Sequence, residues 1–385
     1  MAPQILDSSL PVRPAPTTSP DDQQYPAPLK TSGALDRFSF EETTPAIGRE
    51  FHNVNIVDDL LNASNSDELV RDLAITSIQP NPPPTAISTD NIPPVSQRGV
   101  VFFRAQDNLT DDLQKQLVHR LGQLTGKPSD STLHIHPVLN NTSEFGVADA
   151  QVSTISSLAR KKMFRHENQP NKRRYDSAQW HSDIQFEPAP ANYTSLRLTQ
   201  LPSSGGDTLW ASGYDLYDRF SKPYQKLFDG LTANFVGSGF LDAARMDPVN
   251  VRVHTEPRGS PLNIGEDLAT VHPIVRTNPV TGWKSIYALG PFPKQINELS
   301  PTESDELLKK FYNTILENHD LQVRFKWRNP NDIAIWDNRS AFHTATFDYE
   351  GLGDRFGHRA VGIGEKPYLD PNSISKAEAL AAEDA

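Results

Sequence analysis

A histidine and an aspartate lie two residues apart near the middle of the chain, as His181 and Asp183. We expect the surrounding segment, residues 179–186, to be extended, in which case the two side chains point to the same face. A neutral imidazole and a carboxylate that converge in this way are two of the three ligands of the 2-His-1-carboxylate site, which binds iron(II) and leaves coordination positions open. The third ligand would be a distant histidine. The triplet alone is weak evidence, because a strand-end histidine beside a solvated aspartate gives the same pattern.

The composition restricts both the ligands and the partners. The 385 residues include no cysteine, so any metal must be held by His, Asp or Glu. With 37 Lys and Arg against 48 Asp and Glu, the net charge is −11, which disfavours a generic nucleic-acid surface. Neither a signal peptide nor an apolar run of about 18 residues is readable. We therefore predict a cytoplasmic protein without nucleic-acid or membrane partners, and a homo-oligomer stays open as an alternative.

The chain divides into three parts by composition. Residues 1–40 are rich in Pro, Ser, Thr and Asp and contain few large apolar residues, so we expect them to be disordered. Residues 41–370 form the predicted domain. Residues 371–385 drift into Ala and Glu and are expected to be frayed.

Short strands with a few helices between them are predicted within the domain. Apolar runs or alternation indicate strands at residues 50–57, 99–104, 192–201 and 333–336. Helices are predicted after Thr110, after the capping box of Ser300 and Glu303, and over residues 222–230. This order favours a mainly β protein with flanking helices (α+β), built on a closed or double-sheet core.

Two other stretches could contribute to a site. In residues 133–137 the alternation sends His134 and His136 to the same face, although paired histidines in a strand are more often structural. A basic run between residues 159 and 174 is either a solvated loop or a mobile lid whose cations would attract an anion.

Three motifs together resemble the taurine dioxygenase (TauD/TfdA) family of Fe(II)- and 2-oxoglutarate-dependent oxygenases, and within it the fungal sulfonate dioxygenases. They are the His-x-Asp triplet, the run Gly205–Trp210, and a late segment that holds His343, Arg355 and Arg359 and is preceded by the run Trp336–Arg339. The resemblance covers roughly residues 45–367. It implies a double-stranded β-helix (jelly-roll) core in which the strand of His343 faces the triplet.

The resemblance also implies a role for each matching residue. The iron ligands would be His181, Asp183 and His343. Arg355, aided by Thr208, would bind the distal carboxylate of the cosubstrate 2-oxoglutarate. Arg359 and His136 would hold the anionic head of the substrate, and Phe292 would form an aromatic wall beside it. Leu139 and Ser177 depart from the taurine pattern near the amine end of the substrate.

The implied reaction is hydroxylation of a small anionic substrate by O2, coupled to conversion of 2-oxoglutarate to succinate and CO2. An organosulfonate is the favoured substrate, and it would give an aldehyde and sulfite. One alternative is the same chemistry on an amino acid or other carboxylate in a biosynthetic pathway. A second alternative is a non-catalytic cupin-like binding protein, which would have no use for the pair of Thr208 and Arg355.

Overall fold

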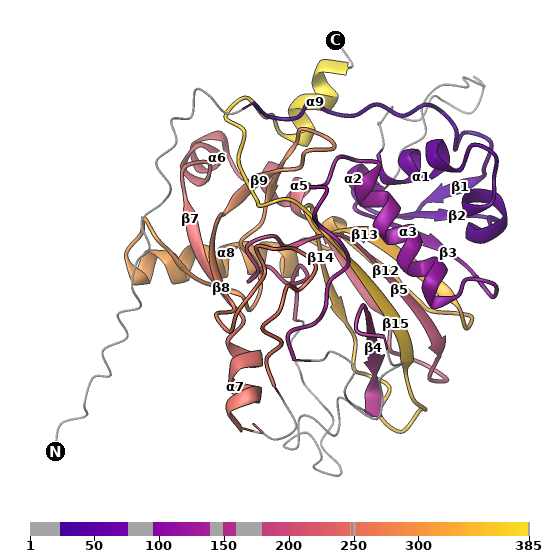
Figure 1. Ribbon diagram of the computed structural model, residues 1–385. Coiled ribbons are helices and arrows are strands. Elements are labelled where there is room, and N and C mark those ends of the chain that lie inside the picture. Colours follow the sequence, from indigo (N-terminus) through magenta and orange to yellow (C-terminus); the bar gives the residue numbers. More distant parts are fainter. Residues whose placement is uncertain are drawn as a thin grey trace.

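Two β-sheets that face each other form the centre of the protein. The computed structural model describes residues 24–75, 95–138, 149–158, 179–246, 248 and 252–383. The larger sheet has the order β1-β2-β3-β13-β5-β15-β4 (Figure 1), and the smaller sheet has the order β12-β6-β14. The strands of the larger sheet are β1 (Phe40–Glu42), β2 (Arg49–Phe51), β3 (Val100–Phe103), β4 (Val152–Ser156), β5 (Ala191–Gln200), β13 (Asp332–Asp337) and β15 (Phe356–Ile363). The smaller sheet consists of β6 (Thr208–Ser212), β12 (Gln322–Phe325) and β14 (Ala341–Ala345).

Strict alternation of side chains divides the apolar residues of the larger sheet between two cores. On β13, Ala334 and Trp336 pack toward the smaller sheet, whereas Ile333 and Ile335 pack on the opposite face. Trp210 of β6 lies against Trp336, with ring centroids 5.6 Å apart. The two sheets therefore enclose one apolar core, as the predicted jelly-roll requires.

Helices cover the outer face of the larger sheet. They are α1 (Ser66–Ala74) and α3 (Asp111–Gln123), and a one-turn helix α2 (Val95–Arg98) precedes β3. The Thr110 side chain accepts the Leu113 N–H and caps α3 as predicted, and Leu117 and Leu121 are buried against the sheet.

A second helical layer lies beside the smaller sheet. It contains α5 (Gly213–Asp218), α6 (Lys222–Phe228) and α8 (Pro301–Glu317) with the sheet β11-β7-β8. The capping box of Ser300 and Glu303 is present at the start of α8. The remaining elements are β7 (Thr232–Val236), α7 (Ser238–Met246), β8 (Ala269–Pro273), β9 (Val275–Thr277), β10 (Lys284–Ile286), β11 (Pro293–Ile296), the 3-10 helix His319–Leu321 and α9 (Lys376–Glu383). Within the described ranges, no helix combines the length and apolar content needed to cross a membrane.

Two predicted strands differ from the structure. The strand expected over residues 50–57 ends at Phe51. The Asn55 side chain accepts the Asp58 N–H and so caps the start of a helical segment, the π-helix of residues 56–61. The stretch of His134 and His136 is not a regular strand either. It meets the sheet through a single bridge between Leu133 and Gly362, beyond the part of β15 that pairs with β4.

The ends of the chain lie against the domain where the structure describes them. In the segment for which composition predicted disorder, Leu35 is buried and the backbone of Ser32 donates to Asp72. In the tail, α9 begins at Lys376, whose Nζ lies 2.8 Å from Asp215 Oδ2. Residues 1–23 lie outside the described residues.

Candidate active site

The His-x-Asp triplet is not extended throughout, contrary to the expectation. His181 forms one antiparallel bridge with His343, through His181 N–H to His343 O (3.1 Å) and His343 N–H to His181 O (2.8 Å). The chain then turns, because the Asp183 N–H donates to the Asn338 side chain rather than to a strand, and Ile184 has a φ of 49°. The bridge joins the triplet to β14, and this brings the two distant histidines together.

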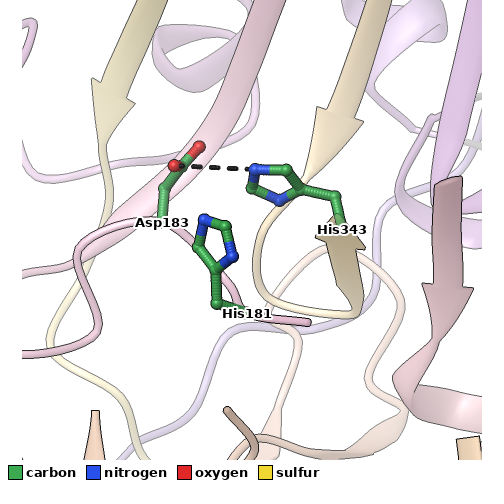
Figure 2. A group of neighbouring side chains, drawn as sticks. All are labelled: His181, Asp183 and His343. Carbon is green, nitrogen blue, oxygen red and sulfur yellow. Dashed lines mark ion pairs between the residues drawn. The ribbon is translucent and has the colours of Figure 1, made fainter. Parts of the chain in front are cut away.

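The side chains of His181, Asp183 and His343 point toward one another (Figure 2). One potential ligand atom of each lies within 4.8 Å of the others, and His343 Nε2 is 3.9 Å from Asp183 Oδ1. His181 Nδ1 lies 2.7 Å from the Gln179 carbonyl oxygen, so Nδ1 carries the proton and Nε2 keeps its lone pair. The cluster thus offers two nitrogen ligands and one oxygen ligand.

The three groups have the protonation states that metal binding requires. Burial lowers the pKa of His343 to about 3 and also lowers the pKa of His181. Burial by itself would raise the pKa of Asp183, but Arg359 and the two histidines outweigh it, and this pKa falls to about 2. At neutral pH both imidazoles are neutral and the carboxylate is charged, which are the forms that bind a metal.

Arg359 of β15 lies directly beside this cluster. Its NH1 donates to Asp183 Oδ1 at 2.7 Å. The Arg359 Nε–H is buried and has no hydrogen-bond partner among the described residues. Because a guanidinium has five N–H donors, Arg359 could bind an external anion while it contacts Asp183. No pattern in the sequence indicated this contact with a candidate ligand.

Arg355 and Thr208, the two residues that the resemblance assigns to 2-oxoglutarate, contact each other. Arg355 donates from NH2 to Thr208 Oγ1 (3.1 Å) and from Nε to the Gly206 carbonyl (2.9 Å). Trp327 Nε1 also donates to Thr208 Oγ1 (3.1 Å), so the hydroxyl accepts two bonds and keeps its own proton to donate. These contacts make a paired donor site.

The charge of Arg355 is what suits this pair to an anion. Its side chain is buried, and burial lowers its pKa to about 10, so it stays charged at neutral pH. Among the described residues it forms no ion pair, and the nearby carboxylate of Asp207 pairs with Arg324 instead. Because a buried charge is costly without a counter-charge, Arg355 and Thr208 could hold a carboxylate.

His136 and Phe292, the residues expected to contact the substrate, both lie beside the ring of Phe240, which the sequence analysis did not identify. The ring of Phe240 lies 4.9 Å from His136 and 6.4 Å from Phe292, and Phe292 lies 6.3 Å from His181. Phe186, 5.1 Å from Phe292, completes the group. Phe240 belongs to α7, which has neither a recognisable cap nor a long apolar stripe in the sequence.

The hydrogen bonds of His136 define which nitrogen can donate. Its Nδ1 accepts the Val138 N–H (3.1 Å), and burial together with Arg359 lowers its pKa to about 3. The ring is therefore neutral and carries its proton on Nε2. Leu139, Ser177 and the basic run of residues 159–174 lie outside the described residues.

A glycine and a buried ion pair fix the loops around the cluster. Gly290 has a φ of 99°, and a Cβ there would lie 2.3 Å from the Trp180 carbonyl oxygen, so only glycine lets the Phe292 loop approach this closely. Glu187, four residues after Asp183, pairs with Arg258, and both side chains are 0% exposed. Arg258 also donates to the His254 carbonyl.

Comparisons with known proteins agree with this geometry. The family model "Taurine catabolism dioxygenase TauD, TfdA family" matches residues 94–361. "Alpha-ketoglutarate-dependent dioxygenase oryG" of Aspergillus oryzae is 44% identical over 361 residues, which are 93% of this chain and 97% of that protein. "Alpha-ketoglutarate-dependent sulfonate dioxygenase" of Saccharomyces cerevisiae is 29% identical over 87% of this chain and 69% of that protein. A crystal structure of a taurine dioxygenase from Burkholderia xenovorans shares the fold, with a TM-score of 0.56, 23% identity and coverage of 87% of this chain and 94% of that one.

The fold and the cluster define an oxygenase that uses iron(II) and 2-oxoglutarate. The chain belongs to the TauD/TfdA family of dioxygenases. The donor set of His181, Asp183 and His343 suits iron(II), because two neutral imidazoles and one carboxylate on one side of an ion leave its other positions open. When bound there with 2-oxoglutarate, iron supplies the activation of O2, and the protein supplies binding, orientation and exclusion of water.

Proposed function

We propose that this enzyme hydroxylates a small organosulfonate, with iron(II) held by His181, Asp183 and His343. The observation that carries the proposal is a second arginine, Arg359, whose NH1 lies 2.7 Å from the candidate ligand Asp183. Arg355 is assigned to 2-oxoglutarate with Thr208. Arg359 contacts Asp183 through NH1 and keeps a buried Nε–H without a partner among the described residues, which suits it to a second anion, that of the substrate. An arginine fork binds a sulfonate or a carboxylate through parallel N–H bonds.

The neighbours of Arg359 fit the remainder of such a substrate. His136 presents a neutral ring that donates from Nε2, and Phe240 and Phe292 form an apolar wall beside it. The anionic head would bind Arg359 and His136, so that the adjacent carbon lies near the iron ligands. Hydroxylation of a carbon that bears a sulfonate lets it collapse to an aldehyde and sulfite. The yeast relative named a sulfonate dioxygenase supports this choice of head group.

Release of sulfite tests the substrate class. We expect the wild-type enzyme, supplied with iron(II), 2-oxoglutarate and a panel of alkyl and aminoalkyl sulfonates, to form sulfite in step with succinate. Arg359→Ala should lose this turnover and, at saturating iron(II), still bind 2-oxoglutarate, because Arg355 and Thr208 form the site for its distal carboxylate without Arg359. A matched control is Arg219→Ala, whose side chain is 41% exposed and pairs with Asp320 outside the site.

The alternative function predicts a different pattern in the same experiment. If the substrate is an amino acid or other carboxylate, succinate should form with a member of a carboxylate panel, and no sulfonate should release sulfite above background. That result would overturn the sulfonate proposal and leave the iron chemistry in place. Absence of coupled succinate with every substrate, together with absence of 2-oxoglutarate binding, would favour the non-catalytic alternative.

Arg355→Lys tests the cosubstrate assignment. An ammonium group is a point charge and cannot reproduce the bidentate fork, so we expect 2-oxoglutarate binding to weaken by about 1.5–3 kcal/mol, the range for a hydrogen bond to a charged group. The measurement is the 2-oxoglutarate concentration needed for half-maximal succinate formation, with Arg219→Lys as the control. An unchanged requirement combined with weaker substrate binding would exchange the roles of Arg355 and Arg359.

A further inference from the structure

The two oxygens of the Asp183 carboxylate have different surroundings. Oδ2 accepts a hydrogen bond from the Thr194 hydroxyl (3.0 Å), whereas Oδ1 accepts one from Arg359 and lies 3.9 Å from His343 Nε2. Asp183 is 3% exposed and Thr194 is 0% exposed. Each oxygen therefore accepts one hydrogen bond, and the Thr194 hydroxyl is the donor that holds Oδ2 while Oδ1 lies on the side of His343.

The direction of the Thr194 hydroxyl is set by Asn338, the third residue of the run Trp336–Arg339. Asn338 Nδ2 donates to Thr194 Oγ1 (2.8 Å) and to the Asn192 carbonyl (3.0 Å). Because Thr194 Oγ1 accepts this bond, its own proton is directed to Asp183 Oδ2. The chain of hydrogen bonds therefore runs from Asn338 through Thr194 to Asp183.

The orientation of the Asn338 amide follows from its four partners. Its Oδ1 accepts the Asp183 N–H (3.1 Å) and the Trp336 indole N–H (3.0 Å). The opposite orientation would place the amide NH2 against these two donors and the amide oxygen against the Asn192 carbonyl, which leaves buried groups unpaired. Asn338, at 1% exposed, thus has one stable orientation.

We propose that Thr194 and Asn338 are positioning residues that make Asp183 a ligand through one oxygen only. A carboxylate with both oxygens available can bind a metal ion in bidentate fashion and occupy a second coordination position. Because Thr194 holds Oδ2, the oxygen on the side of His343 is Oδ1, which would be the ligand atom while it also accepts the Arg359 hydrogen bond, and the second coordination position stays open for 2-oxoglutarate or O2. The inference rests on the metal site of the proposed function, and nothing in that function depends on it.

Replacement of Thr194 by Val tests the proposal, because it keeps the shape of the side chain and removes the hydroxyl. We expect Thr194→Val to change the visible absorption bands of bound Co2+, which report coordination number, and to weaken apparent Co2+ affinity by about 10- to 100-fold, the cost typical for loss of a partner of a metal ligand. It should also weaken binding of 2-oxoglutarate to the Co2+ form. Thr194→Ser should restore the wild-type spectrum.

A second threonine provides the matched control. Thr154 of β4 pairs with His358 of β15, the residue before Arg359. Successive residues of a strand point to opposite faces, so the Thr154 side chain lies on the face of the sheet away from Arg359. Its buried hydroxyl has no hydrogen-bond partner among the described residues. Thr154→Val should leave Co2+ affinity, the spectrum and 2-oxoglutarate binding unchanged. If Thr194→Val does not fold, the smaller Thr194→Ala gives the same test.

The outcomes separate this proposal from the proposed function. A Thr194→Val protein with the wild-type Co2+ spectrum, Co2+ affinity and 2-oxoglutarate titration would overturn the positioning role and leave the metal site standing. Loss of thermal stability in the metal-free protein without a spectral change would assign Thr194 a structural role only, and would equally overturn it. Wild-type protein that binds no Co2+, or binds it equally well after His343→Ala, would refute the metal site itself.

Discussion

His343→Ala, Asp183→Ala and His181→Ala are each expected to abolish substrate-dependent formation of succinate. Each change removes one of three ligands whose candidate atoms lie within 4.8 Å of one another. Loss of a ligand should cost more than the about 10- to 100-fold in metal affinity that follows loss of a ligand's partner. The measurements are succinate produced per enzyme and Co2+ affinity by calorimetry. Asp183→Glu should also be poor, because an added methylene displaces the oxygen in a site that tolerates little error.

Control variants distinguish loss of the metal site from general damage to the fold. His319 lies on the exposed 3-10 helix after α8, and His319→Ala should keep wild-type turnover and Co2+ affinity. Thermal unfolding of the metal-free His181→Ala and His343→Ala proteins should stay close to wild type, since the bridge between His181 and His343 uses backbone groups that alanine retains. Asp183→Ala also removes the partner of Arg359 and Thr194, so this variant should lose some stability. Normal turnover in any one of the three ligand variants would remove that residue from the metal site.

Local signals in the sequence were sufficient for much of the scaffold. Thr110 and the capping box of Ser300 and Glu303 located the starts of α3 and α8, because caps satisfy backbone N–H groups through neighbouring residues. Continuous apolar runs located β3 and β13, each buried on both faces. The jelly-roll and the meeting of His343 with the triplet were predicted only through the family resemblance, since no local pattern relates residues so far apart in the chain.

Features that depend on tertiary contacts could not be predicted from local patterns. The turn at Asp183 follows from its N–H bond to Asn338, far away in the sequence, which replaced the expected strand. The hydrogen bond from Arg359 to Asp183 and the contact of Phe240 with His136 also join residues that lie far apart in the sequence. Each contact joins elements that meet only after the sheets pair, so a periodicity within one segment carries no trace of it.

Removal of one partner from the buried ion pair of Glu187 and Arg258 is expected to destabilise the protein strongly. Arg258→Met leaves the Glu187 carboxylate buried and uncompensated, and such a loss costs about 3–5 kcal/mol of the free energy of unfolding. Arg258 also donates to the His254 carbonyl at 2.8 Å and to the Gly265 carbonyl at 2.9 Å, so its loss should loosen the loop between residues 254 and 265. The measurement is the shift of the urea midpoint of the metal-free protein.

Two further variants show whether burial of the charge causes this loss. The double change Glu187→Leu with Arg258→Met removes both charges, so it should recover a large part of the stability lost in Arg258→Met, because apolar residues of similar volume often replace a buried pair without cost. Arg245→Met breaks an exposed pair with Asp242, in which the Arg245 side chain is 75% exposed, and it should leave the midpoint nearly unchanged. A wild-type midpoint for Arg258→Met would mean that the pair contributes no net stability.

Because Glu187 follows Asp183 by only four residues, loosening this pair should also weaken Co2+ binding in Arg258→Met, whereas Arg245→Met should bind Co2+ as tightly as the wild type.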